Sequence, residues 1–403
     1  MPHYEATLKE AIIREVTQGL PSSTLSSSST TNTHKLPLAG LRIVLNAGNG
    51  SGSFFYKVLH ELGADVSSSI NLTPDGTFPL GSGVPNPEYK PMIDETIQAC
   101  ENCMADLGIM LDTDADRCGL IVPSKKESSS SSSFIKYEAL NRNRLIALLS
   151  VIFSSSSPGC TIVTDSVTSE GLSKFLTQTL GLNHVRYLKG YANVIGKAKE
   201  ITESGQAVAE MAIETSGHCA MRENGYSDDG TYTAVKVIGL LARVSRFSHD
   251  AMNESTIHPS SSTHQQHHRA PNLGLLNLIE ELEEMDEVKE LRMKVMDGTM
   301  ESTDYVFRVL LRSIEDGCKN MQGWKVDTEN LEGIRVRVNS DGTFFMLRKS
   351  LHDPILSLQV EGTSRESVRC GVIQPLLKLF TQGENDKDFD LSQIIDLNTL
   401  RSY

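Results

Sequence analysis

The sequence contains no run of about 18 apolar residues, the length that a helix needs to cross a bilayer. We therefore expect no membrane span. Positive charge is also scarce, because 38 Lys and Arg residues stand against 51 Asp and Glu residues and leave a formal net charge of −13. This balance argues against a nucleic-acid-binding surface.

The N-terminal segment lacks the apolar core of a secretory signal peptide, and its acidic residues argue against a transit peptide. Its apolar residues instead recur at helical spacing and predict an amphipathic helix. The residues of the predicted apolar stripe are Leu8, Ile12, Ile13 and Val16.

Cysteine is sparse, and its seven residues are an odd number scattered along the chain, which is typical of reduced intracellular thiols. Cys100 and Cys103 form a Cys-x-x-Cys pair, but no second pair lies at the spacing of a zinc site. We therefore expect this pair to pack in a core rather than to bind metal or act in redox chemistry.

Four serine-rich tracts interrupt the patterned segments. Such tracts cannot bury enough apolar surface to offset their chain entropy, so we expect surface loops or linkers there. The tracts are Ser26–Ser29, Ser128–Ser133, Ser154–Ser157 and Ser260–Ser262.

An apolar run from Leu107 to Leu111 predicts a buried strand, and three alternating carboxylates follow it directly. In an extended segment, the side chains of Asp112, Asp114 and Asp116 would point the same way. Carboxylates this close repel one another unless a cation lies between them, and a hard divalent ion such as Mg²⁺ prefers oxygen ligands. The pattern therefore predicts a metal loop.

Three other interpretations of this loop compete with a magnesium site. An EF-hand beginning at Asp112 would need Gly and Glu where the sequence has Arg117 and Pro123, so it is excluded. A phosphatase that uses Asp112 as its nucleophile stays open, as does a solvated acidic loop.

Strands alternate with helices from about Phe134 to Thr256, which predicts a parallel, helix-covered sheet with ligands at the C-terminal ends of its strands. Glu214, Ser216 and His218 follow the third of these strands. A carboxylate, a hydroxyl and an imidazole together can hold sugar hydroxyls and move protons, although a plain polar loop is the alternative. Asp228-Asp229 is expected to cap the next helix.

Three further segments carry local patterns. Asn46 to Gly52 is glycine-rich, but it matches neither a dinucleotide fingerprint nor a Walker A loop and is interpreted as a strand-to-helix turn. Leu275 to Met296 is predicted to be an acidic helix. From Trp324 onward, strands, turns and a helix predict an α+β unit with antiparallel strands.

Three motifs together resemble one family, the α-D-phosphohexomutases (phosphoglucomutases and phosphomannomutases). Asp112-Thr-Asp-Ala-Asp-Arg117 resembles the family's metal loop, and Glu214-Thr-Ser-Gly-His218 resembles its sugar-recognition loop. The segment from Arg348 to Pro354 is similar to its phosphate-binding Arg-x-Ser-x-Thr-x-Pro loop, with His352 where the family usually has Thr.

The resemblance implies an α/β fold with two βαβ mixed-sheet domains followed by a smaller α+β domain. The expected boundaries are 1–128 for the first domain, 134–256 for the second, 257–290 for a linker and helix, and 291–403 for the last.

The resemblance also implies a role for each site residue. Asp112, Asp114 and Asp116 would bind Mg²⁺, and Arg117 and His218 would act in catalysis. The residues implied in substrate binding are Lys189, Glu214, Ser216, Arg348, Ser350 and His352. The reaction implied is the interconversion of the 1-phosphate and 6-phosphate of glucose or mannose through the 1,6-bisphosphate, in the cytoplasm or plastid stroma.

One part of the family pattern has no counterpart in the sequence, namely the loop that carries the phosphorylated serine. The segment from Met1 to Leu8 resembles the helix that follows the domain bearing that loop. We therefore expect a phosphohexomutase chain without its phosphoserine domain and with negligible mutase turnover by itself. The alternative is a catalytically inactive paralogue that binds sugar phosphates or has a regulatory role.

Overall fold

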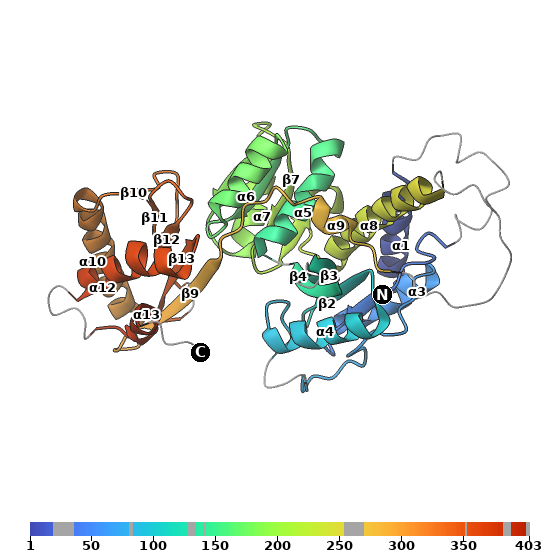
Figure 1. The fold of residues 1–403 in the computed structure, drawn as a ribbon, viewed down its shortest axis with the longest axis horizontal. Helices are drawn as coiled ribbons and strands as arrows, with labels where there is room; N and C mark the ends of the chain where they lie inside the picture. The colour runs from blue at the N-terminus through green and yellow to red at the C-terminus, as the bar shows by residue number, and fades with distance from the viewer. Residues whose placement is uncertain are drawn as a thin grey trace. The chain divides into compact units, whose positions relative to one another are not determined.

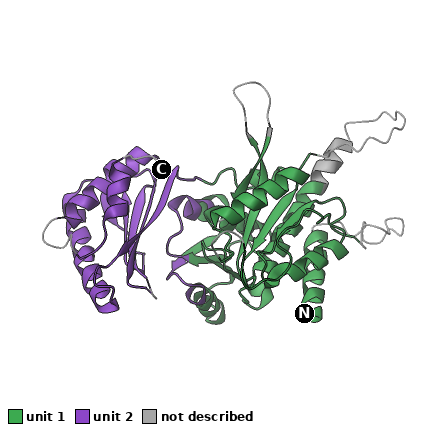
Figure 2. Cartoon of the chain, turned by 90° about the horizontal axis from the view of Figure 1, so that it is seen from below, with its two compact units in different colours: residues 1–164, 176–185, 194–282 green, residues 165–175, 186–193, 283–403 purple. Residues whose placement is uncertain are grey.

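The computed structural model describes most of the chain in eight segments (Figure 1). These are residues 1–18, 36–79, 84–126, 134–140, 142–253, 270–350, 353–381 and 388–399. They form two compact units, which are described separately (Figure 2). Unit 1 comprises residues 1–164, 176–185 and 194–282, and unit 2 comprises residues 165–175, 186–193 and 283–403.

The first sheet has the strand order β1-β2-β3-β4. Its strands are β1 (Ile43–Asn46), β2 (Leu107–Leu111), β3 (Cys118–Lys126) and β4 (Phe134–Leu140). The first pair is parallel and the other two pairs are antiparallel, so the sheet is mixed, as expected. β4 was expected in the second domain, but it pairs with β3 along its whole length and therefore belongs to this sheet.

Four helical segments belong to the same part of the chain as this sheet, and the last of them packs on it (Figure 1). They are α1 (Pro2–Thr17), the short 3₁₀ turn Ser51–Phe54, α3 (Phe55–Glu61) and α4 (Lys90–Cys103). Cys100 of α4 is fully buried in a core with Met110 and Tyr137, so its predicted packing role is confirmed. Most of the predicted apolar stripe on α1 is buried, but Ile13 is 38% exposed, and Glu15 is buried in its place.

The second sheet has the order β6-β5-β7-β8. Its strands are β5 (Thr161–Asp165), β6 (Asn183–Tyr187), β7 (Ala209–Ile213) and β8 (Cys219–Met221). β5 and β7 are parallel, as predicted, and β8 adds an antiparallel edge. The accompanying helices are α5 (Arg142–Ser156), α6 (Glu170–Lys174) with a π-helical turn at Phe175–Thr179, α7 (Tyr191–Glu203) and α8 (Gly230–Asn253).

One serine-rich tract is not a loop, contrary to expectation. Helix α5 continues to Ser156, through most of the tract Ser154–Ser157. The hydroxyls of Ser154 and Ser156 donate to the carbonyls of Val151 and Ile152, so they are satisfied within the helix. The other three tracts lie outside the described residues.

The C-terminal sheet is wholly antiparallel, with the order β10-β11-β12-β13-β9. Its strands are β9 (Glu287–Lys294), β10 (Trp324–Val326), β11 (Ile334–Val338), β12 (Phe344–Lys349) and β13 (Ile355–Gly362). Its helices are α10 (Met300–Asn320), α11 (Arg365–Val368), a π-helical turn Arg369–Ile373, α12 (Gln374–Phe380) and α13 (Ser392–Asn398). This is the α+β unit that the sequence predicts.

The helix predicted between Leu275 and Met296 is wrong. Only the short α9 (Gly274–Asn277) is helical there, and most of the second half is strand β9. In β9, Leu291 and Met293 are buried and alternate with exposed side chains, which is a strand period. Pairing along the whole of β13 outweighs the helical preference of the many Glu and Leu residues. Among the described helices, none is long and apolar enough to cross a bilayer.

Candidate functional site

The carboxylate loop joins β2 to β3 and brings oxygen atoms of Asp112, Asp114 and Asp116 within 4.8 Å of one another. Asp112 is fully buried. Its Oδ1 accepts from the backbone N–H of Arg117 at 3.1 Å, and its Oδ2 accepts from Nε of Arg117 at 2.6 Å. Asp112 therefore closes the loop and fixes the guanidinium of Arg117.

Asp116 provides a test of whether the loop suits a cation. Among the described residues, its Oδ1 is buried and accepts no hydrogen bond. Burial, together with the charge of Asp112, raises the pKa of Asp116 to about 6. Convergent carboxylates with an unsatisfied oxygen fit a hard divalent cation, since such ions take oxygen ligands and would relieve the repulsion.

The glycine-rich turn after β1 supports this loop directly. Ser51 N–H donates to the carbonyl oxygen of Thr113 at 2.9 Å. A Cβ atom on Gly50 would lie 2.6 Å from that oxygen, so only glycine allows the two segments to approach. The turn itself is held by the buried Asn46, whose Oδ1 accepts from Gly48 N–H at 3.0 Å. The local sequence predicts only a turn here, and the contact with the carboxylate loop does not follow from it.

The loop from Glu214 to His218 is joined to the carboxylate loop by main-chain bonds. Cys118 N–H donates to Gly217 O at 3.3 Å, and Arg117 and His218 form an antiparallel bridge. Gly217 has φ of +101°, and a Cβ there would lie 2.8 Å from Cys118 O. This pairing places Arg117 beside His218, although the two residues are far apart in sequence.

His218 is held by Asp228. Its Nδ1 lies 2.8 Å from Asp228 Oδ2 and 3.7 Å from Asp116 Oδ2. Asp228 Oδ1 in turn accepts from Cys219 N–H at 3.0 Å. Burial alone would lower the pKa of His218, but the hydrogen bond to Asp228 and the charges of Asp228 and Asp116 outweigh it, so this pKa is raised.

The predicted capping role is correct for Asp229 and wrong for Asp228. Asp229 Oδ1 accepts from Tyr232 N–H at 2.9 Å at the start of α8. Asp228 turns instead toward His218, because it pairs with β8 through an isolated bridge to Ala220. The sequence shows two adjacent aspartates before a helix, and only the tertiary pairing separates their roles.

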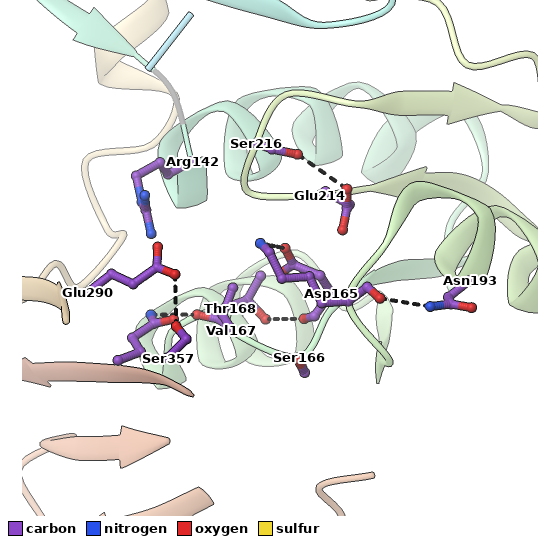
Figure 3. Close-up of polar contacts among 12 residues, drawn as sticks. Arg142, Asp165, Ser166, Val167, Thr168, Asn193, Glu214, Ser216, Glu290 and Ser357 are labelled. Carbon is purple, nitrogen blue, oxygen red and sulfur yellow. Dashed lines mark hydrogen bonds and ion pairs between the residues drawn. The ribbon is translucent and has the colours of Figure 1, made fainter. Parts of the chain in front are cut away.

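Glu214 and Ser216 lie on the same loop as His218 (Figure 3). The Ser216 hydroxyl donates to Glu214 Oε2 at 3.2 Å, and the Glu214 residue is 5% exposed. Glu214 N–H also donates to His218 O at 2.9 Å, which closes the turn. The loop thus presents a carboxylate, a hydroxyl and an imidazole from five consecutive residues.

The remaining predicted residues belong to unit 2. Lys189 Nζ lies 3.2 Å from Asp165 Oδ2, at the C-terminal end of β5. Arg348 NH2 lies 3.2 Å from Glu290 Oε1, which also accepts from the Ser357 hydroxyl at 2.8 Å (Figure 3).

Ser350 N–H donates to Ile355 O at 2.9 Å, and this bond closes the loop after β12. His352 lies outside the described residues. Asp165 and Glu290 were not among the predicted site residues. Asp165 could have been found, because it ends a predicted strand.

A cavity of about 220 Å³ lies beside the carboxylate loop within unit 1. Its polar lining comes from that loop, from the start of α8 and from the N-terminal helix. The lining residues that carry charge or a hydroxyl are Tyr4, Ser51, Asp114, Asp116, Ser227, Asp228, Asp229 and Thr231. The cavity therefore reaches Asp114 and Asp116 of the carboxylate loop and Asp228, the partner of His218. A larger pocket of about 370 Å³ lies in the C-terminal domain and contains none of the predicted site residues.

Fold and site together define an α/β protein in which a loop suited to a divalent cation is paired with a loop bearing a carboxylate, a hydroxyl and an imidazole. Residues 23–125 match the family model for phosphoglucomutase/phosphomannomutase, alpha/beta/alpha domain II, and residues 141–256 match the model for domain III. Together the two matches cover more than half of the 403 residues. The chain belongs to the α-D-phosphohexomutase family.

Several known proteins are similar to this chain. The phosphoglucosamine mutase of Symbiobacterium thermophilum is 30% identical over 211 residues, which are 51% of this chain and 41% of that protein. The phosphomannomutase of Salmonella typhimurium is 32% identical over 198 residues, which are 48% of this chain and 39% of that protein. The chain thus spans about two-fifths of the length of these curated relatives.

Solved structures agree on the fold. A phosphoglucomutase/phosphomannomutase family protein from Burkholderia thailandensis superposes with a TM-score of 0.64 at 20% identity, covering 94% of this chain and 65% of that one. An N-acetylglucosamine-phosphate mutase in its substrate complex has a TM-score of 0.52 at 11% identity, covering 94% of this chain and 65% of that one. These likenesses confirm the expected α/β fold class.

Proposed function

We propose that this chain carries the metal-, sugar- and phosphate-binding parts of a phosphohexomutase. The proposed reaction interconverts the 1-phosphate and 6-phosphate of glucose or mannose through the 1,6-bisphosphate, with Mg²⁺. The observation that carries the proposal is the bridge between Arg117 and His218, because it joins the cation loop to the sugar loop. The mutase relatives and the family models for domains II and III support it.

The carboxylates of Asp112, Asp114 and Asp116 would hold Mg²⁺, which supplies charge neutralisation at a transferring phosphoryl group. Arg117 acts beside them. Because Asp112 holds its Nε, the terminal amino groups of Arg117 are oriented for contact with phosphoryl oxygens.

His218 is the proposed proton carrier. Asp228 engages its Nδ1 and fixes the ring, and Nε2 is the atom that would exchange a proton with the reacting sugar hydroxyl. Glu214 and Ser216 would bind the other sugar hydroxyls from the same loop. Lys189, Arg348, Ser350 and His352 would bind the phosphate that is not being transferred.

Calorimetric titration with glucose 1-phosphate and mannose 1-phosphate in the presence of Mg²⁺ tests the binding half of the proposal. We expect saturable binding, and we expect Glu214→Ala to weaken it by about 10-fold to 100-fold, since a charged group would lose its hydrogen bonds to the sugar. Glu203→Ala, at an exposed glutamate of α7, is the matched control and should leave the affinity unchanged. If the wild-type chain binds neither glucose 1-phosphate nor mannose 1-phosphate, the proposal is refuted.

A turnover assay with glucose 1,6-bisphosphate as activator separates the proposed enzyme from the alternative that the sequence left open. Interconversion that Glu214→Ala abolishes would establish mutase activity in this chain. Binding without interconversion would favour a sugar-phosphate-binding role. Release of phosphate from an aryl phosphate would instead support a phosphatase that uses Asp112.

A further inference from the structure

Two segments that follow strands of the second sheet belong to unit 2. Residues 165–175 continue from β5 and residues 186–193 include the end of β6, yet both group with the C-terminal domain (Figure 2). In α/β sheets the C-terminal strand ends are where ligands bind. The contacts that hold these segments on the C-terminal sheet therefore bear on how a ligand is bound.

The C-terminal sheet has two chemically different faces. One face packs against α10 and α12 through apolar residues such as Val336, Phe345 and Leu358. The other face packs on the segment after β5, where Val167 lies against Phe344 and Met346. Successive side chains along each strand point to opposite faces. The same strands therefore contribute to the apolar core on one face and hold the segment after β5 on the other.

Arg335 of β11 lies on the second face and is only 1% exposed. Its terminal amino groups donate to Ser166 O and to Thr168 O, each at 3.0 Å (Figure 3 draws both acceptor residues). NH2 also lies 3.2 Å from Glu170 Oε1. The guanidinium lies over the Phe344 ring, 3.6 Å from its centroid. The buried side chain of Arg335 thus bonds to two carbonyl oxygens and one carboxylate of residues 165–170.

The charge of Arg335 is retained despite its burial. Burial and the neighbouring Arg186 lower the pKa of Arg335 to about 10, which still leaves it protonated at neutral pH. Glu170 and Asp327 balance it at 3.2 Å and 3.7 Å. Removing the guanidinium would take a charged donor away from two carbonyls inside the protein, and losing a donor there costs more than the net value of the bonds themselves.

The same docking reaches the proposed substrate residues. Glu332, just before β11, accepts from the Ser166 hydroxyl at 2.5 Å and from the Lys189 backbone N–H at 3.0 Å. Lys189 Nζ in turn pairs with Asp165. Arg348 lies on β12, the strand next to β11 in the sheet. Lys189 and Arg348 are therefore carried by one unit.

We propose that Arg335 is a positioning residue that ties residues 165–170 to the C-terminal sheet, so that Lys189 and Arg348 bind the phosphate of one sugar phosphate monoester together. The identity of the ligand rests on the proposed function. The docking of the segment does not, because it follows from the contacts of Arg335 alone.

Hydrogen exchange on the full chain tests the docking. In Arg335→Met, which keeps volume and removes the donors, we expect amides of residues 165–170 to exchange about tenfold faster or more. Peptides from β12 and β13 should be unchanged. Arg337→Met is the control for the exchange of residues 165–170. Arg337 is on the same strand and also pairs with Glu170 and Asp327, but its side chain is 37% exposed, so its loss should change this exchange much less. Unchanged exchange of residues 165–170 in Arg335→Met would overturn the docking.

Affinity for mannose 1-phosphate, measured by calorimetry on the same variants, tests the positioning. We expect about tenfold weaker binding in Arg335→Met and an intermediate loss in Arg335→Lys, whose ammonium is a single point donor. If Arg335→Met does not fold, Arg335→Lys decides both measurements. Faster exchange with unchanged affinity would overturn the positioning role. Failure of the wild-type chain to bind would count against the proposed function, while the exchange result would still decide the docking.

Discussion

Replacing Lys236 by methionine will lower the free energy of unfolding of unit 1 by about 3–5 kcal/mol. Lys236 of α8 is 3% exposed, and its Nζ lies 2.7 Å from Glu15 Oε1 and 2.7 Å from Glu223 Oε1. Glu15 of α1 is fully buried. Methionine would fill the space but leave the Glu15 carboxylate buried with more distant partners, which are Gln18 Nε2 at 3.4 Å, Arg243 NH1 at 3.7 Å and Arg14 Nε at 3.8 Å. Urea denaturation followed by circular dichroism measures the change.

Two further variants distinguish the contribution of the buried Glu15–Lys236 pair to the free energy of unfolding from the general effect of removing a charge. Lys57→Met removes an ion pair from Lys57 of α3 to Glu5 of α1, but Lys57 is 59% exposed, so the loss should be far smaller than in Lys236→Met. The double variant Glu15→Gln/Lys236→Met should recover part of the stability, because the isolated charge is gone. A loss below about 1 kcal/mol in Lys236→Met would contradict this account of how α1 is attached.

The attachment of α1 also shows where sequence reasoning ends. Apolar spacing correctly predicted the helix and the burial of Leu8, Ile12 and Val16. It could not predict that Glu15 is buried while Ile13 is partly exposed, because the partner of Glu15 lies 221 residues further along the chain. An argument from apolar periodicity places every glutamate at the solvent. Glu15 is an exception because it pairs with the buried Lys236.

The same distinction holds at the site. The strand, its three carboxylates and the loop at 214–218 could be found from local patterns, because each is a short run of consecutive residues. Asp228 and Gly50 could not be assigned, since their roles depend on contacts with His218 and Thr113. β9 was mistaken for helix for a related reason. Its composition favours a helix, and its strand exists only because β13 offers a partner.

Replacing Asp114 by asparagine will weaken Mg²⁺ binding by more than about 100-fold, since even partners outside the ligand shell commonly contribute 10-fold to 100-fold. Asp114 is the exposed member of the three carboxylates, so its loss should not disturb the fold. Asp112 is less suitable, because it also fixes Arg117. Calorimetry with Mg²⁺, or spin-resonance titration with Mn²⁺, measures the affinity on the chain without sugar phosphate.

The control for this measurement is Asp94→Asn, the same change at a carboxylate that is 56% exposed on α4 and should leave the affinity unaltered. Unchanged affinity in Asp114→Asn would contradict a cation held by Asp112, Asp114 and Asp116. The structure offers one specific alternative, because Asp116, His218 and Asp228 also bring their ligand atoms within 4.8 Å of one another. Asp228→Asn distinguishes the two sites. Strong weakening in that variant, with Asp114→Asn unaffected, would move the cation to the histidine and leave His218 unable to carry a proton.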